Sequence, residues 1–397
     1  MKYMKFIKIE NRKIFMKILI ILFIYLLNIN IFQLLKIYFI YIYSDYQIKN
    51  VKSYLNYLNS DKSKLIKSFK ICNFPKVSII SPVFNRERYL SRFIRSIQYQ
   101  NFNDIEIILV NDCSSDNSIN IIETFRKKDK RIKVINLKKN KGTFVTRNIG
   151  VLFAKGKYII LPDSDDIISK SIINICYKHC EKYKYEMLKF HLYFRNKYAI
   201  IKQNLLYENK PIYQPELSTK IFYTNDEIYR TDFSLCNKFM KKEIYIKTIN
   251  SINSFYLNQY IINCEDQILN FMLYKTAKSL YNLKVVGYYY IKTSISISRN
   301  VEKISELNNI FRFIYLKIIF ENTKNNKYEK DMCNHLLSFT IDSINLLKLS
   351  LIDINNYKFY NNIIDMYLNN DFITYDNKII LNNLKDKLNK SNKQSKI

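Results

Sequence analysis

Between residues 77 and 161, short apolar runs alternate with amphipathic segments, and this alternation constrains the fold more than any other feature. The apolar runs are Val77–Ser81, Ile105–Val110, Ile132–Ile135 and Tyr158–Leu161, with Met187–Phe194 as a further strand candidate. Between them, apolar side chains recur at helical spacing. These helical segments are residues 89–100, 116–128 and 143–154. A repeated strand–helix order predicts an α/β fold, with a mostly parallel central sheet and flanking helices.

The charge of the chain first suggests a nucleic-acid partner. Its 397 residues include 64 Lys and Arg against 34 Asp and Glu, a formal net charge of +30. However, the basic residues are spread along the whole chain, and no helix-turn-helix, RNP-type or zinc-finger pattern accompanies them. We therefore expect no nucleic-acid partner, and a basic nucleic-acid-binding protein remains an alternative that strongly salt-dependent binding would support.

The beginning of the chain predicts a membrane anchor. Residues 1–17 are basic, and residues 18–35 run without a charge, which as a helix would span about 27 Å, close to a bilayer core. We expect a basic cytosolic tail (1–17), an uncleaved transmembrane helix (18–43) and a polar stem (44–75). This makes the chain a single-pass type II membrane protein, of the Golgi or ER membrane if it is eukaryotic. An apolar helix docked on the soluble domain is the alternative.

Polar residues follow three of the predicted strands, at the edge of the sheet where ligands bind in open α/β folds. The three loops are Pro82–Glu87, Asn111–Asp116 and Pro162–Asp166. Clustered aspartates in the last loop would repel one another without a counter-ion, and a divalent cation such as Mg²⁺ takes carboxylate oxygens together with substrate phosphates. Capping of the helix that follows is the alternative use of these acids.

Two residue counts exclude other phosphate-binding and metal-binding classes. With only four Gly and three His, the chain contains no G-x-G-x-x-G, Walker or H-E-x-x-H motif. Rossmann dehydrogenases, P-loop NTPases and zincins therefore have no motif to support them.

Four motifs in order resemble those of the family 2 glycosyltransferases, which have a GT-A fold. They are Val77–Glu87 (V-S-I-I-x-P-x-[YF]-N-x-E), Asn111–Asp116 (D-D-G-S-x-D), Asn140–Gly150 (N-x-G-x-x-x-x-R-N-x-G) and Asp163–Asp166 (D-x-D-D). Looser likenesses follow at Ser234–Phe239, Cys264–Asp266 and Tyr288–Arg299. The chain departs from the pattern at Asn111, usually Asp, and at Cys113, usually Gly. The resemblance implies a GT-A domain over residues 76–299, followed by a C-terminal helical extension over 300–397.

The resemblance also implies roles for particular residues. The nucleotide-sugar donor would be bound by Pro82, Phe84, Asn85, Glu87, Asp112, Arg147, Asp163 and Asp166. Among these, Glu87 would support the loop and Arg147 would approach the nucleotide or its phosphates. The metal, Mn²⁺ or Mg²⁺, would be held by Asp165 and Asp163. Asp266, with Glu265 beside it, would be the catalytic base, although an acidic pair at a helix N-terminus is also common without catalysis.

The resemblance further implies the reaction, in which a sugar passes with inversion from a nucleotide-sugar donor, a UDP-sugar, to a hydroxyl group on a glycan, lipid or protein. The chain has no Trp, so it lacks the Q-x-x-R-W motif of processive polymer synthases. A catalytically inactive nucleotide-sugar-binding or scaffold protein of the same fold is the alternative.

Overall fold

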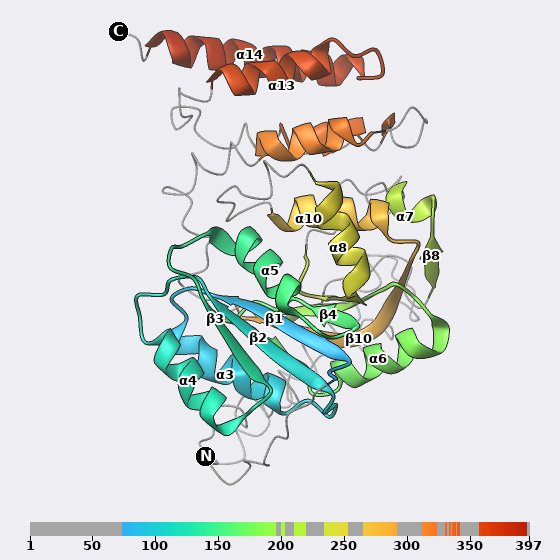
Figure 1. Ribbon diagram of the computed structural model, residues 1–397. Helices are drawn as coiled ribbons and strands as arrows, with labels where there is room; N and C mark the ends of the chain where they lie inside the picture. Colours follow the sequence, from blue (N-terminus) through green and yellow to red (C-terminus); the bar gives the residue numbers. More distant parts are fainter. Residues whose placement is uncertain are drawn as a thin grey trace, which may run out of the picture. The chain divides into compact units, whose positions relative to one another are not determined.

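A mixed sheet organises the described part of the chain (Figure 1). The computed structural model describes residues 74–195, 200–202, 210–219, 234–252, 265–291, 312–323, most of 330–341, and 357–394. The strands of the sheet are β1 (Val77–Val83), β2 (Ile105–Asn111), β3 (Ile132–Asn136), β4 (Tyr158–Ile160), β5 (Ile167–Ile168), β6 (Met187–Arg195), β7 (Ile200–Lys202), β8 (Pro211–Tyr213), β9 (Lys238–Lys241) and β10 (Ser279–Ile291).

The strand order confirms the α/β prediction and adds an antiparallel part. Along the sheet the strands follow the order β3-β2-β1-β4-β9-β6-β10-β5, with β7 beside β6 and β8 beside β10. Strands β3, β2, β1 and β4 run parallel to one another. Strand β9 is antiparallel to both β4 and β6, whereas β6 and β10 are parallel. The sheet is therefore parallel where the alternating pattern predicted it and mixed beyond residue 187.

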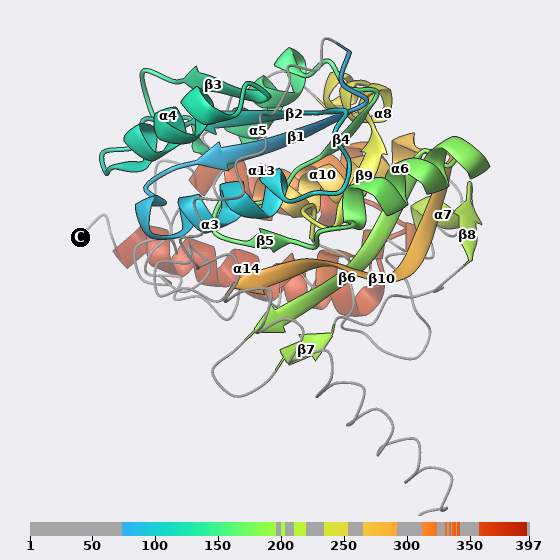
Figure 2. The same ribbon diagram turned by 90° about the horizontal axis from the view of Figure 1, so that it is seen from below.

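Alternating side chains on the strands supply two apolar layers, one on each face of the sheet. In β1, Ile79 packs toward α3 (Glu87–Gln98) and α4 (Ser118–Lys128), while its neighbour Ile80 packs toward α5 (Gly142–Phe153). Figures 1 and 2 show these helices on the two opposite faces. The remaining labelled helices are α6 (Ile172–Tyr183), α7 (Glu216–Thr219), α8 (Lys242–Ser251), α10 (Glu265–Thr276), α13 (Tyr357–Leu368) and α14 (Tyr375–Gln394).

The described residues after 311 are helical and share a core with the sheet. Tyr315 meets Phe271 of α10 edge to face, with ring centroids 6.4 Å apart. The Tyr367 hydroxyl of α13 donates a 2.7 Å hydrogen bond to the carbonyl of Leu316. Apolar residues of α13 and α14 belong to the same buried cluster as α8 and α10. These helices therefore extend the apolar core that α8 and α10 share with the sheet.

The predicted tail, anchor and stem (1–17, 18–43 and 44–75) lie almost wholly outside the described residues. Within the described ranges, no helix combines the length and the apolarity needed to cross a membrane. The anchor and the cellular location stay predictions.

Candidate active site

The loops after β1 and β2 are held together by the side chains of two residues that were predicted to bind the nucleotide sugar. The Asn85 side-chain oxygen accepts a 2.9 Å hydrogen bond from the backbone of Ser115. The Glu87 carboxylate accepts a 3.0 Å bond from the backbone of Asn117, and the Glu87 backbone donates one of 2.9 Å to Asp116. Asn85 has φ 52°, in the left-handed region that Asn tolerates better than most residues. Both residues thus shape the loop pair at the carboxyl end of the sheet.

Asp112 fixes the start of α5. Its buried carboxylate accepts hydrogen bonds from the backbone N–H groups of Lys141 (2.7 Å) and Gly142 (2.9 Å). Gly142 has φ 79°. This backbone conformation is energetically unfavourable for residues that have a Cβ atom, and glycine adopts it readily. A carboxylate at this end of the helix is also favoured by the helix dipole. Asp112 therefore positions the helix that carries Arg147.

The two departures from the family pattern are explained by local geometry. The Asn111 amide donates to the Asn136 side chain (3.1 Å) and accepts from the Ser114 backbone (3.2 Å), a combination that ionised Asp cannot make. Cys113 has φ 60°, so this position keeps the left-handed backbone for which Gly is the usual residue. The loop retains its course despite both changes.

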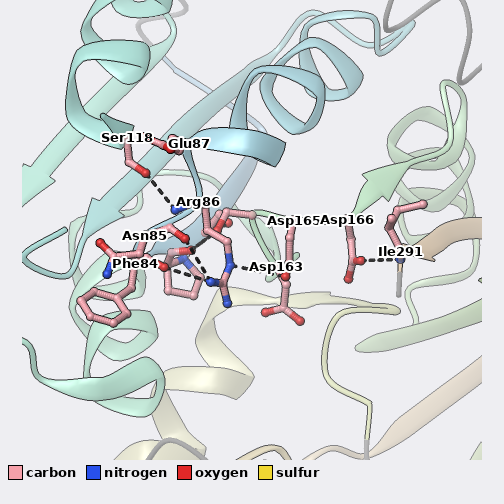
Figure 3. Close-up of polar contacts among 12 residues, drawn as sticks. Phe84, Asn85, Arg86, Glu87, Ser118, Asp163, Asp165, Asp166 and Ile291 are labelled. Atoms are coloured by element: carbon pink, nitrogen blue, oxygen red, sulfur yellow. Dashed lines mark hydrogen bonds and ion pairs between the residues drawn. The ribbon is translucent and has the colours of Figure 1, made fainter. Parts of the chain in front are cut away.

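The aspartates after β4 point in different directions (Figure 3). The Asp163 side chain is 34% exposed, and that of Asp165 is largely buried beside Arg86. Asp166 is only 1% exposed, and its two oxygens accept 2.7 Å bonds from the Tyr288 hydroxyl and the Ile291 backbone of β10. Asp166 was predicted to contact the donor, but here its carboxylate is used to join this loop to β10.

The acidic loop is also tied to β1, since the Ser164 hydroxyl donates a 2.7 Å bond to the carbonyl of Pro82. Beside Pro82, the side chain of Phe84 is exposed at the rim of the loop pair. Pro82 thus lies beside the acidic loop, and donor binding by Pro82 and Phe84 stays a prediction.

Burial and mutual repulsion shape the charges of this loop. Burial raises the pKa of Asp165, Arg86 opposes that effect, and Asp163 adds to it. Burial, followed by the charges of Asp165 and Asp163, raises the pKa of Asp166 well above its usual range. A cation placed between Asp163 and Asp165 would relieve this repulsion.

Arg147 joins the acidic loop to the predicted catalytic pair. Its side chain is only 2% exposed, and one guanidinium nitrogen lies 2.5 Å from Asp163. The other terminal nitrogen lies 2.7 Å from Asp266 and 3.2 Å from Glu265. Burial alone would lower the pKa of Arg147, but the three carboxylates outweigh it and raise the pKa well above its usual value. Arg147 was expected to approach the nucleotide, and the structure pairs it with acids from two distant segments.

Asp266 and Glu265 lie at the start of α10 and differ in accessibility. The Asp266 side chain is 27% exposed and also accepts a 3.3 Å bond from the Leu235 backbone, whereas that of Glu265 is 11% exposed. Burial and the charge of Asp266 raise the pKa of Glu265 to about 8, although Arg147 opposes them. Burial likewise raises the pKa of Asp266, against the opposing effect of Arg147. Of the two acids, Asp266 is the one that an acceptor hydroxyl could reach.

The site suits a cation that shares its coordination with a phosphate ligand. Within the described ranges, no cluster of three or more His, Cys, Asp or Glu side chains is arranged to hold a metal ion. Mg²⁺ needs only one or two carboxylates where substrate phosphates complete its shell. Asp163 and Asp165 supply such a pair, and each already attracts a guanidinium group.

Two residues of the site were missed by the sequence analysis. Arg86 occupies the variable position between Asn85 and Glu87, so the motif drew attention to its neighbours only. Tyr288 was noted as part of a resembling segment, without a role. Its hydroxyl accepts a 3.0 Å bond from the Asp163 backbone while donating to Asp166, so it holds the acidic loop against β10.

Comparison with solved structures supports a fold of the GT-A type. The crystal structure of S. aureus TarS 1-349 in complex with UDP-GlcNAc matches with a TM-score of 0.61 at 18% identity, covering 80% of this chain and 89% of that one. At this identity the match concerns the fold. Residues 78–248 match the family described as Glycosyl transferase family 2, and this segment is a family 2 glycosyltransferase domain.

Curated relatives align over about a quarter of the chain. Glycosyltransferase GlyG of Streptococcus pneumoniae is 36% identical over 106 residues, which are 27% of this chain and 35% of that protein. The GalNAc(5)-diNAcBac-PP-undecaprenol beta-1,3-glucosyltransferase of Campylobacter jejuni is 37% identical over 111 residues, 28% of this chain and 36% of that protein. The chain thus spans little more than a third of the length of these relatives.

Proposed function

We propose that this chain is an inverting, metal-dependent glycosyltransferase that moves a sugar from a UDP-sugar to a hydroxyl group of a glycan, lipid or protein. The observation that carries the proposal is the Arg147 cluster. The Arg147 guanidinium lies 2.5 Å from the carboxylate of Asp163, in the D-x-D-D motif, and 2.7 Å from that of Asp266, in α10. These two acids are 103 positions apart in the sequence. This proximity supports a donor site and a base that act together.

Different residues of the chain would act on the sugar donor and on the acceptor hydroxyl. Asp163 and Asp165 would hold a Mn²⁺ or Mg²⁺ ion. This ion would act as a Lewis acid that stabilises the leaving diphosphate. Asp266 would accept the proton of the acceptor hydroxyl from the face of the sugar opposite the diphosphate. A carboxylate is a weak base for an alcohol, so it takes the proton only as the new bond forms, and its position matters more than its basicity.

Two names among the similar proteins support the substrate classes. The solved complex that shares the fold contains UDP-GlcNAc, in keeping with a UDP-sugar donor. The Campylobacter relative is named as a glucosyltransferase acting on an undecaprenol-linked saccharide, in keeping with a glycan or glycolipid acceptor.

A donor screen tests the proposal. Nucleoside diphosphate release is measured for the purified full chain against a panel of nucleotide sugars, with Mn²⁺, with Mg²⁺ and with EDTA. We expect release from a UDP-sugar that needs metal and is abolished in Asp165→Ala. Asp104→Ala is the matched control, because it removes a carboxylate from an exposed ion pair with Lys76 and should leave release unchanged.

The same screen addresses the alternative of an inactive protein with this fold. Metal-dependent binding of UDP without turnover of any donor in the panel would favour the binding or scaffold protein over the enzyme.

A further inference from the structure

Arg86 places a positive charge on the carboxylate that is expected to hold the metal. Its Nε lies 3.3 Å from the Asp165 carboxylate, and one terminal nitrogen donates to the carbonyls of Phe84 (3.1 Å) and Asn85 (3.3 Å). The Arg86 backbone is anchored separately, by a 2.9 Å bond to the Ser118 hydroxyl. Figure 3 shows the guanidinium between the loop after β1 and the acidic loop. The side chain is 15% exposed, so the pair is largely shielded from water.

We infer that Arg86 is a built-in counter-charge that competes with the divalent cation for Asp165, and that a nucleotide diphosphate relieves this competition. The inference deepens the proposed function and rests on it. Its consequence is coupling: the cation binds weakly to the free protein and tightly together with the nucleotide.

The coupling follows from charge. A divalent cation bound at Asp165 would lie close to the guanidinium, and two positive charges in a shielded site repel each other strongly. A diphosphate supplies the oxygens that a guanidinium binds best, in paired hydrogen bonds, so it offers Arg86 another partner. If nucleotide improves cation binding in this way, the cation must improve nucleotide binding by the same factor.

Arg86 is free to make this exchange, whereas the other arginine of the site is not. Arg147 is fixed between three carboxylates and is 2% exposed. Besides its ion pair with Asp165, the Arg86 guanidinium donates to neutral backbone carbonyls of its own loop. Arg92 donates to the backbone carbonyl of Asp165 at 3.4 Å, and its positive charge also acts on the Asp165 carboxyl group, less strongly than that of Arg86.

Mn²⁺ binding measured by electron paramagnetic resonance tests the inference without relying on turnover. The purified full chain is titrated with Mn²⁺, with and without UDP, for wild type, Arg86→Gln, Arg86→Lys and Arg88→Gln. Arg88 is exposed on α3 two positions away, so its variant makes the same charge change away from Asp165.

In wild type and Arg88→Gln we expect UDP to tighten Mn²⁺ binding about tenfold, within the usual range of coupling. In Arg86→Gln, Mn²⁺ should bind about fivefold or more tightly without UDP, and the effect of UDP should shrink. Arg86→Lys keeps the charge and should keep weak binding of Mn²⁺ alone.

Different results would contradict the inference about Arg86 and the proposed metal dependence. If Mn²⁺ alone binds Arg86→Gln no more tightly than wild type, while UDP still promotes Mn²⁺ binding, the inference about Arg86 is wrong and the proposed function stands. If Mn²⁺ binds none of the proteins even with UDP, the metal dependence and the inference are both wrong.

Discussion

Replacement of Arg147 by Met tests whether one buried guanidinium holds the two halves of the site together. The side chain has three carboxylate partners at 2.5, 2.7 and 3.2 Å and is almost fully buried. Met retains much of the apolar bulk but leaves Asp163, Glu265 and Asp266 facing one another without a counter-charge. Removing one partner of a buried ion pair costs about 3–5 kcal/mol in the free energy of unfolding.

Thermal unfolding of the purified full chain measures this loss. For a domain of this size, 1 kcal/mol corresponds to about 2–4 °C in Tm, so Arg147→Met should unfold about 6–20 °C lower than wild type at pH 8. At pH 5 the loss should be smaller, because carboxyl groups left without their arginine can take up protons and become neutral.

Arg126→Met is the matched control for this prediction. Arg126 is exposed and pairs with Glu123 on the surface of α4, where an ion pair contributes at most about 1 kcal/mol. A loss of less than about 1 kcal/mol in Arg147→Met at pH 8, or the same loss at pH 5 and pH 8, would refute the argument.

Three further predictions concern single residues of the described part. Asp266→Asn should lower kcat about 10²–10⁴-fold while the donor KM changes little, as steady-state kinetics would show, and a near-normal kcat would remove Asp266 as the base. The raised pKa of Glu265 means that the folded chain keeps a proton that the unfolded chain releases between pH 4.5 and about 8. The free energy of unfolding should therefore fall as pH rises through this window, and Tm measured across it should fall less in Glu265→Gln; equal slopes would contradict the assignment. Gly156→Ala should lower the free energy of unfolding, measured in urea, by about 1–3 kcal/mol. A Cβ atom at this position would lie 2.6 Å from the Ser78 backbone nitrogen and 2.8 Å from the Val77 carbonyl carbon. An unchanged urea midpoint would contradict this prediction, because it would show that the backbone moves to make room.

The sequence predicted the fold of the segment from β1 to β4 because the signals in this segment are local. Strands β1, β2 and β4 are buried apolar runs, and β3 is a partly buried one. Amphipathic helices separate them, and each strand was located to within a few residues. Strand β10 was not expected, since Ser279–Ile291 is rich in Tyr and lacks a clear alternation of apolar and polar residues. Its pairing with β6 depends on a partner about ninety residues away, which no local pattern reports.

The site shows the same division between local and long-range information. The motifs pointed to Asp163, Asp165 and Asp266 as acids of one site, and the structure brings Asp163 and Asp266 onto Arg147. The directions of the Asp166 and Arg147 side chains could not be predicted, because contacts more than a hundred residues apart set them. Asp166 turns toward Tyr288, and Arg147 takes its partners from α10.

The stereochemistry of transfer is the most direct test of the central claim, that a donor site and a single base, Asp266, act on opposite faces of the sugar. Proton NMR of the product formed from a UDP-sugar accepted in the donor screen reports its anomeric configuration. We expect a configuration opposite to that of the donor, and product formation about 10²–10⁴-fold slower with Asp266→Asn. Retention of the donor's configuration, or undiminished transfer by Asp266→Asn, would contradict it.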